Sequence, residues 1–364
     1  MPDPQPWQPI PFHFWSVVMF TFGSIVGSFL NVCIHRMPRG ESVVVPPSHC
    51  PHCNYSIPWY LNLPLVTWWM LGGRCKNCGA RISVRYFLVE LLTALVFLGC
   101  WLAFGRQAPA LALVYCLLLA GFIVATFIDV EHFIIPDEIT LGGIAAGFVC
   151  SLLVPALHGA PTTALSLEHC FAGILLGAGL VYGVLRLGKL FFGRLKFELP
   201  PDTKVFFTET ALKLPDKEIP FDEIFYRKSD TIVLEARHVE LVDRCYARAS
   251  VRLSPAMLRI NDQKFNPEEF EYMEVVTDEI VVPREAMGLG DVKFMAAIGA
   301  FLGWEAVVFS LMLSAVIGAG VGILLIALRK SAWSSKLPYG PYIALAATIW
   351  IFVGRKIIAW WLVR

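Results

Sequence analysis

Long apolar runs limit what this chain can fold into more than any other feature of its sequence. The longest runs lie at about 14–35, 86–104, 110–128, 139–157, 168–192, 306–328 and 338–362, and a shorter one follows Asp291 through about Leu302. Each long run has the length needed to cross a bilayer. Only 16% of the residues are charged, against about a quarter in soluble domains. The sequence therefore predicts an all-α polytopic membrane protein with about eight transmembrane helices.

The basic residues beside these runs predict how the helices are oriented. Arg36 and Arg39 follow the first run, whereas no Lys or Arg precedes it. Because basic loops stay in the cytoplasm, the amino terminus is expected outside and the segment 36–85 inside. Alternation then places Asp129, at the end of the third run, on the cytoplasmic side. No secretory signal peptide is expected, since the first residues lack a basic start.

Residues 194–286 differ in kind from the rest of the chain. They hold 14 basic and 19 acidic residues, a net charge of −5, so a soluble domain interrupts the membrane core. Apolar and polar residues alternate in Tyr246–Leu253, a pattern typical of a half-buried strand. The residues expected to be buried there are Ala247, Ala249, Val251 and Leu253. Strand-like composition also marks 204–208, 231–239 and 280–282. We expect a small β-rich cytoplasmic insertion that binds no nucleic acid and carries no catalytic motif.

Four of the ten cysteines form two CxxC pairs in the segment 36–85. The pairs are Cys50/Cys53 and Cys75/Cys78, with 21 residues between them. Each pair makes a tight turn that aims both sulfurs at one ion, which predicts a tetrahedral Zn²⁺ site. Disulfides, which a reducing cytoplasm disfavours, and unliganded thiols are the alternatives. With four protein ligands the zinc is expected to be structural, in a loop too short to build a core of its own.

Acidic residues are almost absent outside the insertion, where the chain holds only ten. Five of these lie in two segments, FIDVEHFIIPDE, which contains Asp129, and GLGD, which contains Asp291. A carboxylate at a bilayer is costly unless something pairs with it or uses it. Both aspartates are expected on the same side of the membrane. They are therefore predicted to share one proton and to activate water for peptide hydrolysis.

Several neighbours of the two aspartates are candidates for supporting roles. They are Asp137, Gly288, Gly290 and Lys293. The glycines let the backbone turn tightly and approach a neighbour closely. Alternatively, the acids cap helices or pair with Lys293 and Arg284, and for Asp137, which follows Pro136, this structural role is equally well supported.

Other polar residues near the membrane have two interpretations each. Asn31, His35 and Arg36 either line an entrance for substrate or cofactor, or form interhelical hydrogen bonds and anchor the helix end. Glu90, an acid within the second run, is either functional or paired with Arg85. The remaining acids of the first aspartate segment are expected to be solvated or to contact a basic substrate.

The two aspartates are expected to differ in their affinity for the shared proton. Asp129 ends a helix, where the negative end of the macrodipole disfavours a carboxylate, whereas Asp291 begins one. Lys293 adds positive charge near Asp291. We therefore expect Asp129 to hold the proton, although the pair titrates as a unit.

Three segments carry a resemblance to a known family. They are GSFLNVCIHRMPRG at 27–40, IDVEHFIIPD at 128–137 and GLGDVKFMAAIGAFLGW at 288–304. The CPHC and CKNCGARISVRYFLVELLTA stretches belong to the same pattern. Over nearly its whole length except 194–286, the chain resembles the bifunctional prepilin peptidases, also called type IV prepilin leader peptidases and N-methyltransferases.

The resemblance implies an aspartic protease of the GxGD type, with Asp129 and Asp291 as the catalytic pair. It implies that a short basic leader is cleaved after a glycine, on the cytoplasmic side of the bacterial inner membrane. The substrates would be type IV pilins or the pseudopilins of type II secretion. The resemblance also implies methylation of the new α-amino group by S-adenosylmethionine. The sequence indicates neither the residues that bind this cofactor nor the oligomeric state.

Three positions depart from the family's pattern, all in the part linked to methyl transfer. Leu61 stands in place of an acid, Gly72 in place of an arginine, and Phe87 in place of a proline. A peptidase without methyltransferase activity is therefore one alternative. A non-enzymatic transport or assembly protein, whose acids are ion ligands, is another.

The sequence is thus predicted to have five parts. The first transmembrane helix lies in 1–35, and the zinc-binding loop linked to methyl transfer is 36–85. Helices that carry the first catalytic aspartate form 86–193. The soluble insertion is 194–286, and 287–364 holds the helices with the GLGD motif.

Overall fold

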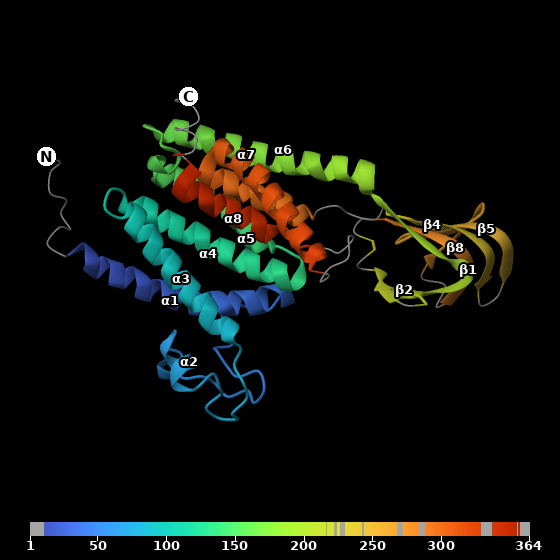
Figure 1. Ribbon diagram of the computed structural model, residues 1–364, viewed down its shortest axis with the longest axis horizontal. Helices are drawn as coiled ribbons and strands as arrows, with labels where there is room; N and C mark the ends of the chain where they lie inside the picture. Colours follow the sequence, from blue (N-terminus) through green and yellow to red (C-terminus); the bar gives the residue numbers. More distant parts are fainter. Residues whose placement is uncertain are drawn as a thin grey trace. The chain divides into compact units, whose positions relative to one another are not determined.

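The computed structural model describes most of the chain and divides it into two compact units. The described residues are 11–215, 217–221, 224–225, 230–241, 244–267, 272–283, 288–328, 337–354 and 356. One unit comprises the residues up to Tyr182 together with those from Leu289 onward, and the other comprises 183–288. The first unit is helical and the second is built on a β-sheet (Figure 1).

Helices of membrane length make up most of the first unit. The long helices are α1 (Phe12–Arg36), α3 (Val84–Phe104), α4 (Pro109–His132), α6 (Thr163–Phe192), which continues into the second unit, and α7 (Leu289–Ala327). The shorter helices are α2 (Val66–Met70), α5 (Asp137–Leu153) and α8 (Gly340–Ile349), which continues as a π-helical segment, Trp350–Gly354. Single 3₁₀ turns lie at Met37–Arg39, Trp59–Leu61 and Pro155–His158. The five long helices are apolar enough to cross a membrane, so the predicted polytopic membrane protein is confirmed.

The expected number of eight spans is not confirmed, because several apolar helices are short or merged. Among the described residues, only five helices have the length and hydropathy of a span. α5 has 17 residues and α8 has 10, and nearly all residues beyond Gly354 lie outside the described part. The runs expected near 291–302 and 306–328 correspond to the two helical parts of α7, which meet at Gly303, where φ is 81° and ψ is 177°. Glycine adopts such an angle without strain.

One strained residue and a proline define the turn after Asp129. α4 ends before Phe133, whose φ of 56° lies in the left-handed region. Positive φ is uncommon for a bulky aromatic residue and is costly unless its surroundings hold it. Pro136 then stands at the amino-terminal cap of α5. The connection between α4 and α5 is therefore short and tightly constrained.

A glycine sets the closest contact between α1 and α3. The pairs α1–α3, α5–α7 and α7–α8 pack against each other. A Cβ atom at Gly27 in α1 would lie only 2.7 Å from the Cα atom of Glu90 in α3. Such contacts at small residues are typical of helices packed in membranes. Gly27 thus allows α1 to lie directly against the backbone of Glu90.

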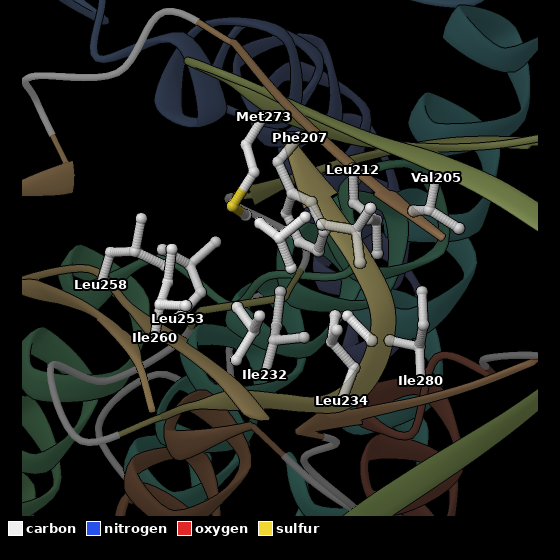
Figure 2. Close-up of a cluster of buried hydrophobic side chains, with 14 of the residues drawn as sticks. Val205, Phe207, Leu212, Ile232, Leu234, Leu253, Leu258, Ile260, Met273 and Ile280 are labelled. Atoms are coloured by element: carbon white, nitrogen blue, oxygen red, sulfur yellow. The ribbon is translucent and has the colours of Figure 1, made fainter. Parts of the chain in front are cut away.

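The second unit is an eight-stranded antiparallel sheet with the strand order β3-β2-β1-β8-β4-β5-β6-β7. The strands are β1 (Arg194–Thr208), β2 (Ala211–Leu214), β3 (Lys217–Pro220), β4 (Ile232–Leu241), β5 (Cys245–Ser254), β6 (Met257–Ile260), β7 (Gln263–Phe265) and β8 (Tyr272–Pro283). Their buried side chains form an apolar core, part of which Figure 2 shows. The predicted β-rich insertion is confirmed, and the four expected strand segments lie in β1, β4, β5 and β8.

One detail of the predicted strand alternation is wrong. Ala249, Val251 and Leu253 in β5 are buried as expected, but Ala247 is exposed. The next residue, Arg248, has a φ of 53°, which interrupts the extended backbone that alternation requires. The period-two pattern therefore holds only from Ala249 onward.

Candidate functional site

Asp129 is a buried residue in the last turn of α4, with only 5% of its surface exposed. Its Oδ2 atom accepts a hydrogen bond of 2.8 Å from the backbone N–H of Gly340, the first residue of α8. A Cβ atom at position 340 would also lie 2.8 Å from this oxygen, so the approach requires glycine. A residue 211 positions later in the chain thus holds the Asp129 carboxyl group in place.

Asp291 is likewise buried, in the first turn of α7, and is 9% exposed. Further along α7, Ser314 Oγ shares a hydrogen bond of 2.9 Å with the hydroxyl group of Tyr339, the residue before Gly340. Both aspartates are therefore buried acids on helices that contact the turn at the start of α8.

The side chain of Ile135 connects the surroundings of the two aspartates. A Cβ atom at Gly340 would lie 3.1 Å from Ile135 Cδ1, and one at Gly290 would lie 3.4 Å from Ile135 Cβ. Gly340 is the hydrogen-bond donor to Asp129, and Gly290 directly precedes Asp291. The structure therefore brings the end of α4, the start of α7 and the start of α8 together around one buried isoleucine.

Two of the predicted supporting residues, Asp137 and Lys293, pair with each other. Lys293 Nζ lies 2.6 Å from Asp137 Oδ1, and the pair joins the first turn of α5 to the first turn of α7. Asp137 thus has both structural roles considered for it, at a helix start and in an ion pair. Exposed pairs of this kind contribute only about 0–1 kcal/mol, so the contact positions the two helices more than it stabilises them.

The two predicted glycines do not form the tight turn expected of them. Gly288 is exposed just before α7, and Gly290 lies in its first turn. Neither has a positive φ. The close approach at Gly290, to Ile135, is at an ordinary contact distance. The start of α7 is therefore a regular helix. Because Gly290 has no side chain, the backbone of this turn can lie close to Ile135.

Of the two alternatives for Glu90, the ion pair with Arg85 is not formed. Arg85 in α3 forms its ion pair with Glu131 of α4. Glu90 is buried, and its Oε2 atom accepts a hydrogen bond of 2.7 Å from the backbone N–H of Leu65. Glu138 is exposed, as expected.

Asn31 and Arg36 have the structural roles considered for them. Asn31 Nδ2 donates to the backbone carbonyl of Tyr86 at 3.0 Å, which joins α1 to α3. Arg36 is buried at the end of α1 and donates to the carbonyl oxygens of Ser42 and Pro46, at 2.9 and 2.7 Å. The arginine thereby holds the loop after α1 against the helix end.

The four predicted metal ligands lie together in the loop between α1 and α3. The sulfur atoms of Cys50, Cys53, Cys75 and Cys78 are within 4.8 Å of one another. Cys50 Sγ is 3.8 Å from Cys78 Sγ, and Cys53 Sγ is 4.0 Å from Cys75 Sγ. Sulfurs bound tetrahedrally at a Zn–S distance of about 2.3 Å are about 3.8 Å apart. The cluster therefore has the size of a four-thiolate metal site.

The two cysteine pairs lie in turns with the same hydrogen-bond pattern. In each turn, the N–H of the first cysteine donates to the carbonyl five residues later, and its own carbonyl accepts from the N–H four residues later. The distances are 3.0 and 2.9 Å in the turn at Cys50 and 2.8 and 2.9 Å in the turn at Cys75. Asn54 and Gly79, which follow the second cysteines, both have positive φ, 54° and 69°. This local repeat was not predicted, although Asn or Gly after each pair is its signal.

Hydrogen bonds to sulfur favour the ligand form of two of the cysteines. The side-chain amide of Asn77, 3.6 Å from Cys53 Sγ, and the backbone N–H of Tyr55 lower the pKa of Cys53 to about 6. The backbone N–H groups of Cys78 and Asn77 lower the pKa of Cys75. Because the thiolate binds metal, these bonds favour metal binding.

Three relatives show what the chain, or part of it, is similar to. A protein of Aeromonas hydrophila named prepilin leader peptidase/N-methyltransferase is 29% identical over 378 residues, which cover 97% of this chain and 95% of the relative. A protein of the same name from Myxococcus xanthus (strain DK1622) is 41% identical over 190 residues, 48% of this chain and 55% of the relative. The type 4 prepilin-like proteins leader peptide-processing enzyme of Escherichia coli O78:H11 (strain H10407 / ETEC) is 40% identical over 173 residues, 43% of this chain and 61% of the relative. No solved structure matches the chain.

Two family models match separate parts of the chain. The bacterial peptidase A24 N-terminal domain matches residues 21–104, and the type IV leader peptidase family matches residues 271–323. These matches make the chain similar to the type IV leader peptidase family. The first match contains the cysteine cluster and the second contains Asp291.

Gly340, which contacts Asp129, was not predicted from the sequence. It lies in the segment Pro-Tyr-Gly-Pro, 338–341, directly before an apolar run. A glycine between prolines marks a turn in which the backbone approaches a neighbour closely. That neighbour is Asp129, which the sequence alone does not indicate.

Proposed function

We propose that this protein is a membrane aspartic endopeptidase that removes the leader of prepilins or pseudopilins and methylates the new amino terminus. The observation that carries the proposal is the pair of buried acids, Asp129 and Asp291, at helix ends whose neighbouring glycines, Gly340 and Gly290, both approach Ile135. The names of the relatives, which combine leader peptidase and N-methyltransferase, support both activities.

Two carboxyl groups that share one proton can hydrolyse a peptide bond without a metal or a covalent nucleophile. In the proposed reaction, ionised Asp291 takes a proton from the attacking water. Neutral Asp129 donates a hydrogen bond to the carbonyl oxygen of the scissile bond. The N–H of Gly340 donates a hydrogen bond to Oδ2 of Asp129, so the shared proton is placed on Oδ1.

The positions of the aspartates on their helices support this division of roles. Asp129 lies at the carboxyl end of α4, where the helix dipole disfavours a negative charge. Asp291 lies at the amino end of α7, where the dipole favours it. Infrared difference spectra of the two single Asp→Asn variants test the assignment. A protonated carboxyl band that persists in Asp129→Asn and vanishes in Asp291→Asn would contradict it.

The proposed substrate is a precursor whose basic leader precedes an apolar helix, and cleavage follows a glycine. We place the active site at the cytoplasmic face of the bacterial inner membrane, because Arg36 and Arg39 follow the first membrane helix. The exposed carboxylate of Glu138, next to Asp137 at the start of α5, offers negative charge to the leader.

We also propose that the cysteine cluster binds one structural Zn²⁺. The spacing of the sulfurs fits tetrahedral coordination, and four thiolates leave no position for a reacting water. The ion would hold together a loop with few regular elements of its own, whose folding would then depend on metal binding.

Cleavage of a purified prepilin by membranes that contain the wild type or Asp291→Asn tests the peptidase. Loss of cleavage in the variant is expected. Undiminished cleavage would contradict the aspartate mechanism and leave the acids as ion ligands or structural groups. Mass spectrometry of the mature pilin then shows whether its first residue gains a methyl group, with S-adenosylmethionine as the donor. An unmethylated product would support a peptidase without the second activity.

A further inference from the structure

A cavity of about 400 Å³ lies between the cysteine-bearing loop and the ends of α1 and α3 that this loop connects. Its wall is largely apolar and includes the aromatic side chains of Trp68, Tyr86 and Phe87. Cys50 and Cys75 also line it, so the cysteine cluster forms part of its wall. Neither aspartate of the proposed peptidase site does. A cavity of this volume is large enough to enclose a small organic ligand.

Glu90 brings a buried carboxylate to this wall. The residue lies in the second turn of α3 and is 9% exposed. Its carboxylate accepts hydrogen bonds from the backbone N–H of Leu65, at 2.7 Å, and from the hydroxyl of Ser28. Both of these donors are neutral. Within the part of the chain that the structure describes, no Lys, Arg or His side chain forms an ion pair with Glu90.

A second acceptor in the wall, the side-chain oxygen of Asn31, has no hydrogen-bond donor among the described residues. Asn31 is 2% exposed, and its Nδ2 atom is bound to the carbonyl of Tyr86. Its Oδ1 atom has no hydrogen-bond partner among the described residues. A buried carboxylate without a cation is costly, and so is a buried carbonyl oxygen without a donor. The ligand that relieves both costs carries a positive charge and N–H or O–H groups.

Trp68 offers this ligand a flat aromatic face. Its ring centroid lies 5.4 Å from that of Phe87, which helps to fix its orientation. A heteroaromatic base stacks on such a ring, and a cation is attracted to its face. The neighbouring Trp69 is 70% exposed and does not line the cavity. The two adjacent tryptophans therefore differ in their access to the ligand.

We infer that this cavity is the binding site for S-adenosylmethionine, with the Glu90 carboxylate beside the sulfonium cation and the Trp68 ring beside the adenine. The inference rests on the proposed methyltransferase activity. A nucleoside that carries a sulfonium group offers a positive charge for Glu90, a flat base for Trp68 and N–H or O–H donors for Asn31 Oδ1. The cysteine cluster, as part of the same wall, then supports methyl transfer by shaping the site.

Binding measurements on the full-length protein in nanodiscs test the role of Glu90. S-adenosylmethionine is compared with S-adenosylhomocysteine, the product that lacks the methyl group and the sulfonium charge. The wild type is expected to prefer the charged ligand by about tenfold, as for a partly desolvated charge pair. Glu90→Gln keeps an acceptor for Leu65 but removes the charge, so the preference should fall to nearly equal affinities. Glu305→Gln, an exposed acid outside the cavity, is the matched control and should keep the wild-type preference.

A second pair of variants tests the aromatic wall. Trp68→Leu should weaken both ligands equally, by about tenfold, because stacking of the base does not depend on the sulfonium charge. Trp69→Leu should change neither affinity. Circular dichroism and cysteine-bound zinc content, measured on every variant, show whether the loop is still folded.

The outcomes separate this inference from the proposed function. An unchanged ligand preference in Glu90→Gln, with a folded loop and a methylated pilin from the wild type, overturns the site but leaves the methyltransferase standing. Failure of the wild type to bind either ligand, together with an unmethylated pilin, overturns both. Equal losses in Trp68→Leu and Trp69→Leu contradict the placement of the adenine.

Discussion

The aspartate pair and the cysteine cluster are two sites built in opposite ways. The four cysteines come from a short segment in which two similar turns, each closed by its own hydrogen bonds, direct the sulfurs inward. The surroundings of the aspartates come from α4, α7 and α8, and Gly340 is 211 positions from the residue it contacts. The cluster depends on local backbone geometry, whereas the aspartates depend on helix packing. Damage to one site should therefore leave the other intact, and the following predictions are ordered by their effect on leader cleavage.

The largest effect is expected from the aspartates themselves. Asp129→Asn and Asp291→Asn should each reduce kcat for leader cleavage by at least about 10³-fold, because a general acid or base is lost. The zinc content of the purified protein should stay at the wild-type value, because the cysteine turns do not depend on these helix ends. A loss of zinc in either variant would contradict the independence of the two sites. Cleavage assays and metal analysis on the same preparations provide both measurements.

Gly340→Ala should have the next largest effect, a reduction in kcat of about 10- to 100-fold. The added Cβ atom would lie 2.8 Å from Asp129 Oδ2 and must displace the carboxyl group from its backbone donor. Gly121→Ala, in the same helix as Asp129, is the matched control, because a Cβ atom there meets nothing within 4 Å. Similar activities of the two alanine variants would show that the Gly340 contact does not position Asp129.

A smaller effect is expected when the ion pair between α5 and α7 is removed. Lys293→Met and Asp137→Asn should each lower cleavage by no more than about fivefold, because exposed ion pairs contribute about 0–1 kcal/mol. The double variant should be little worse than either single variant, since both remove the same contact. A loss of several hundredfold in Lys293→Met alone would instead place the lysine in the chemistry.

Cysteine substitutions should affect cleavage least. Cys53→Ala removes a ligand and should abolish zinc binding and pilin methylation, with less than about a twofold change in kcat for cleavage. Cys245→Ala, an exposed cysteine of β5 outside the cluster, is the control and should change none of the three. A large loss of cleavage in Cys53→Ala would show that the loop and the aspartates act as one site. Metal analysis, cleavage and mass spectrometry of the pilin make the comparison.

The cysteine cluster depends on local backbone geometry and the aspartates on helix packing, and this difference decides how much of each site could be predicted. The CxxC spacing was enough to predict the cluster, because two residues between cysteines already determine a turn. The scarcity of acids singled out Asp129 and Asp291 as candidates, and both are buried at helix ends. The contact from Gly340 and the packing of Ile135 depend on how distant helices meet, and nothing local in the sequence records that.

The helices themselves show a similar limit. The apolar runs gave the positions of the membrane helices, but hydropathy does not distinguish two spans from one helix interrupted at a single glycine. The alternative that Glu90 pairs with Arg85 failed for a related reason. Arg85 was judged by its distance along the chain, whereas in the structure it reaches across to Glu131 of α4. In the insertion, the alternating strands were predicted well, except where the backbone angle at Arg248 breaks the pattern.

The pairing of β1 with β8 has a consequence for the rest of the chain. Arg194, the first residue of the sheet, is directly opposite Pro283, the last. Opposed residues of antiparallel strands are about 5 Å apart. The chain therefore enters and leaves the sheet at neighbouring points, as it would enter and leave a tight hairpin. Such a domain can gain or lose strands, or be replaced, while the distance between its first and last residues stays the same.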